Sequence, residues 1–135
     1  MRSLYLGSVV EKSGKSMVTL GLAKNFQGQV GFFKPFKERL MREGDRVIDQ
    51  DAYLMRHVLN LDKPEEVLCP FTYDVFRAAR MDDVKAAYKK AACDCDMMLI
   101  EGTREVTTGY LNDVSGLAIA EATGSDLVLI STPET

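Results

Sequence analysis

A glycine, a lysine and a serine stand in a row near the start of the chain, as Gly14-Lys15-Ser16. An apolar run over residues 4–10 precedes them, and an amphipathic run begins at Met17. The order of strand, tight loop and helix is typical of a phosphate-binding loop, whose last three positions are Gly-Lys-Ser or Gly-Lys-Thr. Successive backbone N–H groups at the start of such a helix form a cradle for an anion.

This loop predicts contacts with a bound phosphate chain. We expect Lys15 to reach the terminal phosphates and the Ser16 hydroxyl to bind Mg²⁺. The predicted nucleotide-binding residues are Lys12, Ser13, Gly14, Lys15 and Ser16. The first glycine of the full pattern would fall at position 9, where this chain has Val9. A purely structural turn between strand and helix is the alternative interpretation.

Two more charged residues come directly after apolar runs. Lys34 follows residues 30–33, and Glu101 follows residues 97–100. Because the carboxyl ends of parallel strands carry the binding site in α/β sheets, both side chains are expected near the loop. An apolar strand ending in an acid is typical of a carboxylate delivered to Mg²⁺. The alternatives are an edge lysine that reaches solvent and an acid at an exposed strand end.

Asp49 and Asp51 fall at the start of a helix predicted over residues 48–60. Carboxylates in the first turn are favoured by the helix dipole, so a capping role is the simplest interpretation for both. His57 is the one histidine of the sequence and lies in the middle of the same helix. A surface or packing role is favoured for it over catalysis.

Apolar periodicity predicts the remaining elements. Strands are expected over residues 3–10, 30–34, 96–102 and 126–131, and helices over 15–26, 48–60, 73–93 and 114–123. Residues 36–46 are charged and are expected to form a loop. The predicted buried faces of the first two helices contain Val18, Leu22 and Phe26, and Val47, Leu54, Val58 and Leu61. The fold class is α/β, a three-layer P-loop NTPase-like fold with a short parallel sheet of about four strands flanked by helices.

Composition excludes several classes of function. The 135 residues are 46% hydrophobic and 27% charged, which fits one domain over residues 1–135. A net charge of −3 argues against a general partner of nucleic acid or of a membrane surface. No apolar run reaches about 18 residues and no signal peptide is recognisable, so we expect a cytoplasmic protein. The three cysteines show no framework spacing and are expected to be reduced thiols.

Taken together, the order of these residues resembles dethiobiotin synthetase. It also resembles the relatives of that enzyme, namely the BioD-like N-terminal domain associated with phosphate acetyltransferases and cobyrinic acid a,c-diamide synthase. The resemblance covers residues 3–131. Three features look closer to the acetyltransferase-associated branch: Val-Thr-Leu-Gly-Leu after the loop, the Gly-Phe-Phe-Lys-Pro strand, and Asp51-Ala-Tyr-Leu-Met followed by Cys-Pro.

The resemblance implies ATP and Mg²⁺ as cofactors. It gives Lys15 and Lys34 as the catalytic lysines, with Lys15 on the phosphates and Lys34 as the second lysine. It gives Ser16, Asp51 and Glu101 as the ligands of Mg²⁺, and all three are hard oxygen donors. It also implies a homodimer and ATP-dependent activation of a small carboxylate or carbamate.

The chain departs from the synthetase pattern at several positions. Val9, Val10 and Lys12 alter the start of the loop, and Thr103-Arg104-Glu105 replaces a glycine-rich run. The sequence ends soon after the fourth predicted strand, so the C-terminal portion of the full fold, including its adenine pocket, is expected to be lacking. A regulatory or accessory nucleotide-binding domain is therefore favoured, with an ATP-dependent ligase as the alternative. A structural domain with a vestigial loop is the third hypothesis.

Overall fold

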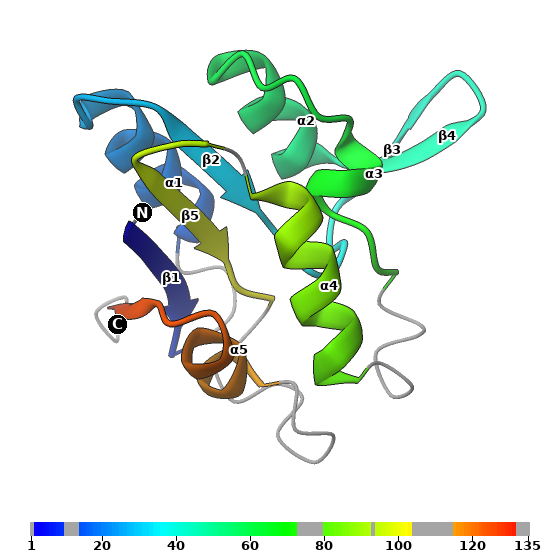
Figure 1. Ribbon diagram of the computed structural model, residues 1–135. Helices are drawn as coiled ribbons and strands as arrows, with labels where there is room; N and C mark the ends of the chain where they lie inside the picture. Colours follow the sequence, from blue (N-terminus) through cyan, green and yellow to red (C-terminus); the bar gives the residue numbers. More distant parts are fainter. Residues whose placement is uncertain (1, 10–13, 73–79, 93, 104–114, 132–135) are drawn as a thin grey trace, which may run out of the picture.

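The computed structural model describes residues 2–9, 14–72, 80–92, 94–103 and 115–131. Its main sheet has four parallel strands in the order β2-β5-β1-β6 (Figure 1). These strands are β1 (Arg2–Ser8), β2 (Val30–Phe33), β5 (Met97–Glu101) and β6 (Asp126–Ile130). The predicted short parallel sheet is confirmed, and all four strands lie where the apolar runs placed them.

Helices cover both faces of the sheet, giving three layers. One face is covered by α1 (Lys15–Asn25) and α2 (Gln50–Val58), and the other by α4 (Met81–Ala91) and α5 (Gly116–Ala122) (Figure 1). A single turn, α3 (Glu65–Leu68), lies between α2 and α4. None of the described helices combines the length and apolar character needed to cross a bilayer.

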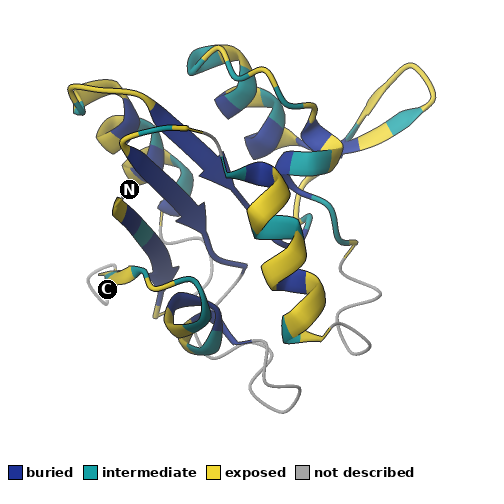
Figure 2. Ribbon diagram, viewed as in Figure 1, coloured by how far each residue is buried: buried dark blue, intermediate teal, exposed yellow. Residues whose placement is uncertain are grey.

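Alternation along β5 divides the core between the two faces. Met98 and Ile100 pack with the residues under α4 and α5, whereas Met97 and Leu99 pack on the opposite side. All five residues of this strand are buried, as are those of β2 (Figure 2). Burial on both faces explains why these strands read as continuous apolar runs rather than as alternating patterns.

The expected loop over residues 36–46 was wrong in part. Residues Leu40–Glu43 form β3 and Arg46–Asp49 form β4, an antiparallel hairpin that projects from the domain (Figure 1). Its turn contains Gly44 at a φ of +63°, a conformation that favours glycine. The hairpin mixes charged and apolar side chains, and its apolar Leu40 and Val47 are exposed, so its sequence shows no regular apolar alternation. Because β4 extends to Asp49, the helix expected from residue 48 begins at Gln50.

The predicted buried faces of the first two helices were wrong in part, although Phe26 and Leu61 pack against the core as predicted. Val18 and Leu22 are each 37% exposed, and the side of α1 turned to the sheet carries Lys15, Thr19 and Ala23. In α2 the buried apolar residues are Ala52 and Met55, whereas Val47 and Leu54 are exposed. Lys15 points inward in the first turn of α1, and residues four and eight positions later must then follow it inward.

Candidate phosphate-binding site

The loop meets the helix at a glycine with a left-handed backbone. Gly14 is the N-cap of α1 and has a φ of +85°, where a residue with a Cβ would be strained. Its carbonyl accepts a hydrogen bond from the backbone N–H of Val18 at 3.1 Å. The predicted contacts of Lys12 and Ser13 lie outside the described residues.

Lys15 is buried at the start of α1 and points toward the end of β1. Its ammonium donates to Ser8 Oγ at 3.3 Å, and the Thr19 hydroxyl donates to the Lys15 carbonyl at 2.7 Å. Burial lowers the pKa of Lys15, although the negative charges of Glu38 and Glu101 oppose that shift. An anion bound beside Lys15 would favour its charged form further.

Ser16 and Glu101 are in direct contact although 85 positions separate them. The Ser16 hydroxyl donates to Glu101 Oε1 at 2.8 Å. Glu101 stands opposite Leu6 in the β1–β5 ladder and is 1% exposed. Its second oxygen, Oε2, is buried and has no hydrogen-bond partner among the described residues. Burial, with repulsion from Asp51 and Asp49, raises the pKa of Glu101 to about 8 against the attraction of Lys34.

Lys34 follows β2 and is fully buried among carboxylates. Its ammonium lies 2.8 Å from Asp51 Oδ2, 3.0 Å from Asp49 Oδ2 and 3.4 Å from Glu38 Oε1. Burial alone would lower the pKa of Lys34, but these carboxylates and Glu101 outweigh it and raise the pKa above its usual value. The interpretation of Lys34 as an edge lysine that reaches solvent is therefore wrong.

Asp51 connects the lysine to the serine. Burial acts to raise the pKa of Asp51, but the charge and hydrogen bond of Lys34 outweigh it. The Ser16 hydroxyl beside Asp51 also helps to lower that pKa. Ser16 therefore lies beside both carboxylates that the sequence pattern grouped with it. Five of the predicted site residues converge at one edge of the sheet: Lys15, Ser16, Lys34, Asp51 and Glu101.

Sequence reasoning missed the second role of Asp49 and missed Glu38 altogether. The predicted cap is confirmed, because Asp49 Oδ1 accepts from the backbone N–H groups of Asp51 at 2.8 Å and Ala52 at 3.1 Å. Asp49 also accepts from Lys34 and from the backbone N–H of Glu38 at 2.9 Å. A buried lysine requires negative partners, so Glu38, four positions after Lys34, could have been predicted as one of them.

Tyr5 packs against Gly102, the residue that follows Glu101. A Cβ placed on Gly102 would lie 2.6 Å from the Tyr5 hydroxyl oxygen, closer than real Cβ atoms come. Tyr5 is buried, and burial together with the charges of Glu38 and Glu101 raises its pKa above the usual value. The glycine after Glu101 is therefore explained by packing against Tyr5.

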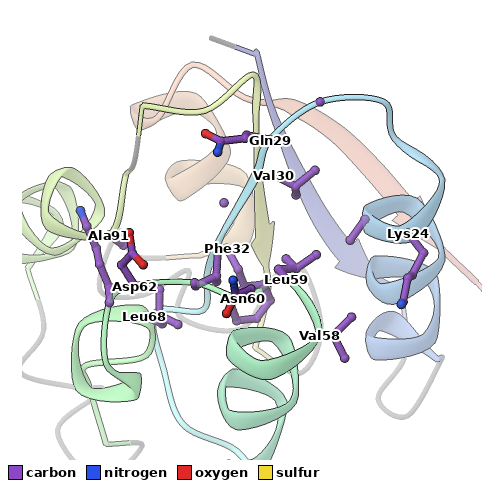
Figure 3. A pocket seen from close by; sticks show the side chains of 15 residues that line it. Lys24, Gln29, Val30, Phe32, Val58, Leu59, Asn60, Asp62, Leu68 and Ala91 are labelled. Carbon is purple, nitrogen blue, oxygen red and sulfur yellow. The ribbon is translucent and has the colours of Figure 1, made fainter.

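A cavity of about 390 Å³ lies elsewhere, at the amino end of β2. Figure 3 shows Lys24 of α1 on one side of it and Ala91 of α4 on the other. Its described lining residues include none of the five that converge near the phosphate-binding loop. The cavity is therefore separate from the candidate site.

Two cysteines and the one histidine of the sequence lie among the described residues. Cys69 is a free thiol, and burial raises its pKa well above its usual value. His57 is exposed, and its Nδ1 lies 2.8 Å from the Tyr53 carbonyl oxygen one turn earlier. Within those same residues no three histidine, cysteine or acidic side chains form a ready metal site. A metal at Ser16 and Glu101 would thus need further oxygen donors.

Comparison with known proteins identifies the family of this chain. The family model AAA_26, described as an AAA domain, matches residues 2–135. A phosphate acetyltransferase of Pseudomonas aeruginosa is 23% identical over 141 aligned positions, which cover 99% of this chain and 20% of that enzyme. The chain thus spans about a fifth of the length of this relative. It belongs to the AAA_26 family of AAA domains and is a BioD-like P-loop nucleotide-binding domain related to phosphate acetyltransferase.

Proposed function

We propose that this domain binds ATP together with Mg²⁺ at the carboxyl edge of the sheet. The observation that carries the proposal is the buried Glu101 carboxylate, which touches Ser16 at 2.8 Å through one oxygen and leaves the other without a partner among the described residues. A buried polar atom without a partner is costly, and a metal ion would satisfy it.

The residues present fit a hard divalent cation. Ser16, Asp51 and Glu101 offer a hydroxyl and two carboxylates, the oxygen donors that Mg²⁺ prefers. Mg²⁺ usually keeps several waters and takes its remaining ligands from phosphates, so a few protein donors suffice. When bound, the ion would bridge and neutralise phosphate oxygens.

In this proposal the two lysines act on the nucleotide. Lys15 neutralises the terminal phosphates, and backbone N–H groups at the start of α1 add to this. Lys34 supplies a second positive charge from the end of β2, which β5 separates from β1 in the sheet. Positioning and charge stabilisation are the main contributions that a protein makes to phosphoryl chemistry.

A regulatory or accessory role in a phosphate acetyltransferase-type protein is the biological function we favour. The similarity to one fifth of such an enzyme supports it. The second candidate is an ATP-dependent ligase that activates a small carboxylate or carbamate. The burial of Lys34 beside Asp51 favours that candidate, because a buried cation there could polarise a transferring phosphoryl group.

Two further proposals concern the assembly and its compartment. A homodimer is supported by the unpaired outer edge of β6 in the described sheet, and sedimentation would measure it. A cytoplasmic location is supported by the buried free thiol of Cys69.

Calorimetric titration with ATP and Mg²⁺ tests the central proposal. We expect the wild type to bind and Lys15→Ala to bind about 100-fold more weakly, a loss of about 2.7 kcal/mol. Lys24→Ala is the matched control, because it removes an exposed lysine from the far end of the same helix. Equal affinity in wild type and Lys15→Ala would overturn the proposal. Release of ADP only when a carboxylate is supplied would favour the ligase.

A further inference from the structure

The Lys34 ammonium has three N–H donors, and each has a carboxylate within reach. The ammonium donates hydrogen bonds to Asp51 at 2.8 Å and Asp49 at 3.0 Å, and it forms an ion pair with Glu38 at 3.4 Å. In this arrangement three carboxylates compete with a phosphate oxygen for the Lys34 ammonium. A role for Lys34 toward a nucleotide therefore requires that one carboxylate leave it.

Asp49 is the partner least able to leave. Its side chain has 0% exposure and accepts from three backbone N–H groups, those of Glu38, Asp51 and Ala52, in addition to Lys34. Moving it would uncap α2 and leave several buried donors unpaired. Asp49 is thus a fixed anchor for the lysine.

Asp51 is held much less firmly. Its side chain is 12% exposed and contacts Lys34 and the Ser16 hydroxyl. Ser16 in turn donates to Glu101, whose other oxygen is unpartnered among the described residues. Asp51 therefore stands between a lysine that holds it now and a pair of oxygen donors suited to a divalent cation.

We infer that Lys34 and a divalent cation compete for Asp51, so that cation binding transfers Asp51 away from Lys34 while Asp49 retains the lysine. This inference rests on the proposed function, because it takes Ser16, Asp51 and Glu101 as the cation site. The exchange frees one N–H donor of Lys34 for a phosphate oxygen. Metal and nucleotide binding are coupled through this one lysine.

The first test measures Mn²⁺ affinity without nucleotide, by electron paramagnetic resonance of free Mn²⁺. Lys34→Met removes the competitor, and we expect about tenfold tighter Mn²⁺ binding than in the wild type. Lys15→Met is the matched control, because it removes the same charge from the same site but leaves the Lys34–Asp51 contact intact. Equal gains in Mn²⁺ affinity in both variants, or no gain in Lys34→Met, would overturn the proposed competition for Asp51.

The second test measures the wild-type protein and uses a conservative variant only to assign a signal. The ammonium protons of Lys34 are followed by NMR with ¹⁵N-labelled lysine while Mg²⁺ is added, and Lys34→Arg assigns the signal. We expect Mg²⁺ to shift this signal and to leave the amide signal of Ala52, which reports the Asp49 anchor, in place. A Lys34 signal that does not move at saturating Mg²⁺ would refute the exchange alone. Failure of Mg²⁺ and Mn²⁺ to bind even with ATP would instead refute the proposed function as well.

Discussion

Two groups of buried ion pairs differ in how their charges balance. In one, the Glu65 side chain is 1% exposed and lies between two arginines, at 2.6 Å from Arg56 and 3.4 Å from Arg46. In the other, Lys34 is surrounded by Asp49, Asp51 and Glu38, with Glu101 behind them. In the first group two cations converge on one buried acid, and Arg46 also pairs with Glu43 and Glu66 at the surface. In the second group several acids converge on one buried cation.

The direction of the pKa shifts reflects this difference. Burial acts to raise the pKa of Glu65, but the hydrogen bond and charge of Arg56 outweigh it, so the pKa is lowered and the acid stays ionised. Burial and neighbouring acids raise the pKa of Glu101 to about 8, and one of its oxygens is unpartnered among the described residues. The Glu65 cluster has its charges paired and joins the β3–β4 hairpin to α3. The Lys34 and Glu101 cluster has an excess of acids and is suited to accept a cation.

The largest effect is expected for Lys34→Met. Removing the cation leaves several buried acids without their partner, so the free energy of unfolding should fall by about 4–5 kcal/mol. Urea denaturation measures it, with Lys24→Met at an exposed site as the control. Mg²⁺ should restore more stability to this variant than to the wild type, since a cation replaces the lost charge. A loss of unfolding free energy no greater than that of Lys24→Met would contradict a stabilising role for Lys34 among its carboxylates.

The next effect is a pH dependence assigned to Glu101. Because its pKa is raised in the folded state, its contribution to stability is complete below about pH 4.5 and is lost as pH rises toward 8. In buffer with EDTA the free energy of unfolding should fall on the order of 3 kcal/mol across that range. Glu101→Gln should remove most of this slope. Glu121→Gln, at an exposed site, is the control and should keep the slope. An unchanged slope in Glu101→Gln would show that another group causes the pH dependence.

The smallest effect is expected for Glu65→Gln, at about 1–2 kcal/mol of unfolding free energy at pH 7. Because the pKa of Glu65 is lowered on folding, its contribution is present above about pH 4.3 and is lost as pH falls. The difference between the unfolding temperatures at pH 7 and pH 3 should therefore be smaller in Glu65→Gln than in the wild type. Its neighbour Glu66 is about half exposed, so Glu66→Gln should behave as the wild type.

Much of the fold could be predicted because parallel strands buried on both faces leave long apolar runs in the sequence. Residues 30–34 and 96–102 were predicted as strands, and β2 and β5 lie within them. The hairpin Leu40–Asp49 could not be predicted, since its charged and apolar side chains do not alternate regularly along the strands. The buried face of α1 was mispredicted because the inward turn of Lys15, rather than apolar spacing, decides it.

Residue type and order determined which side chains could bind phosphate and metal: a Gly-Lys-Ser loop, and a lysine and an acid at the ends of two apolar strands. They also determined the parallel sheet that brings those ends together. Only the tertiary structure decided how the charges are shared, because partners are set by distances of about 3 Å between segments far apart in sequence. It gave Lys34 its carboxylates, added an anchoring role to the Asp49 helix cap, and left one oxygen of Glu101 unpartnered among the described residues.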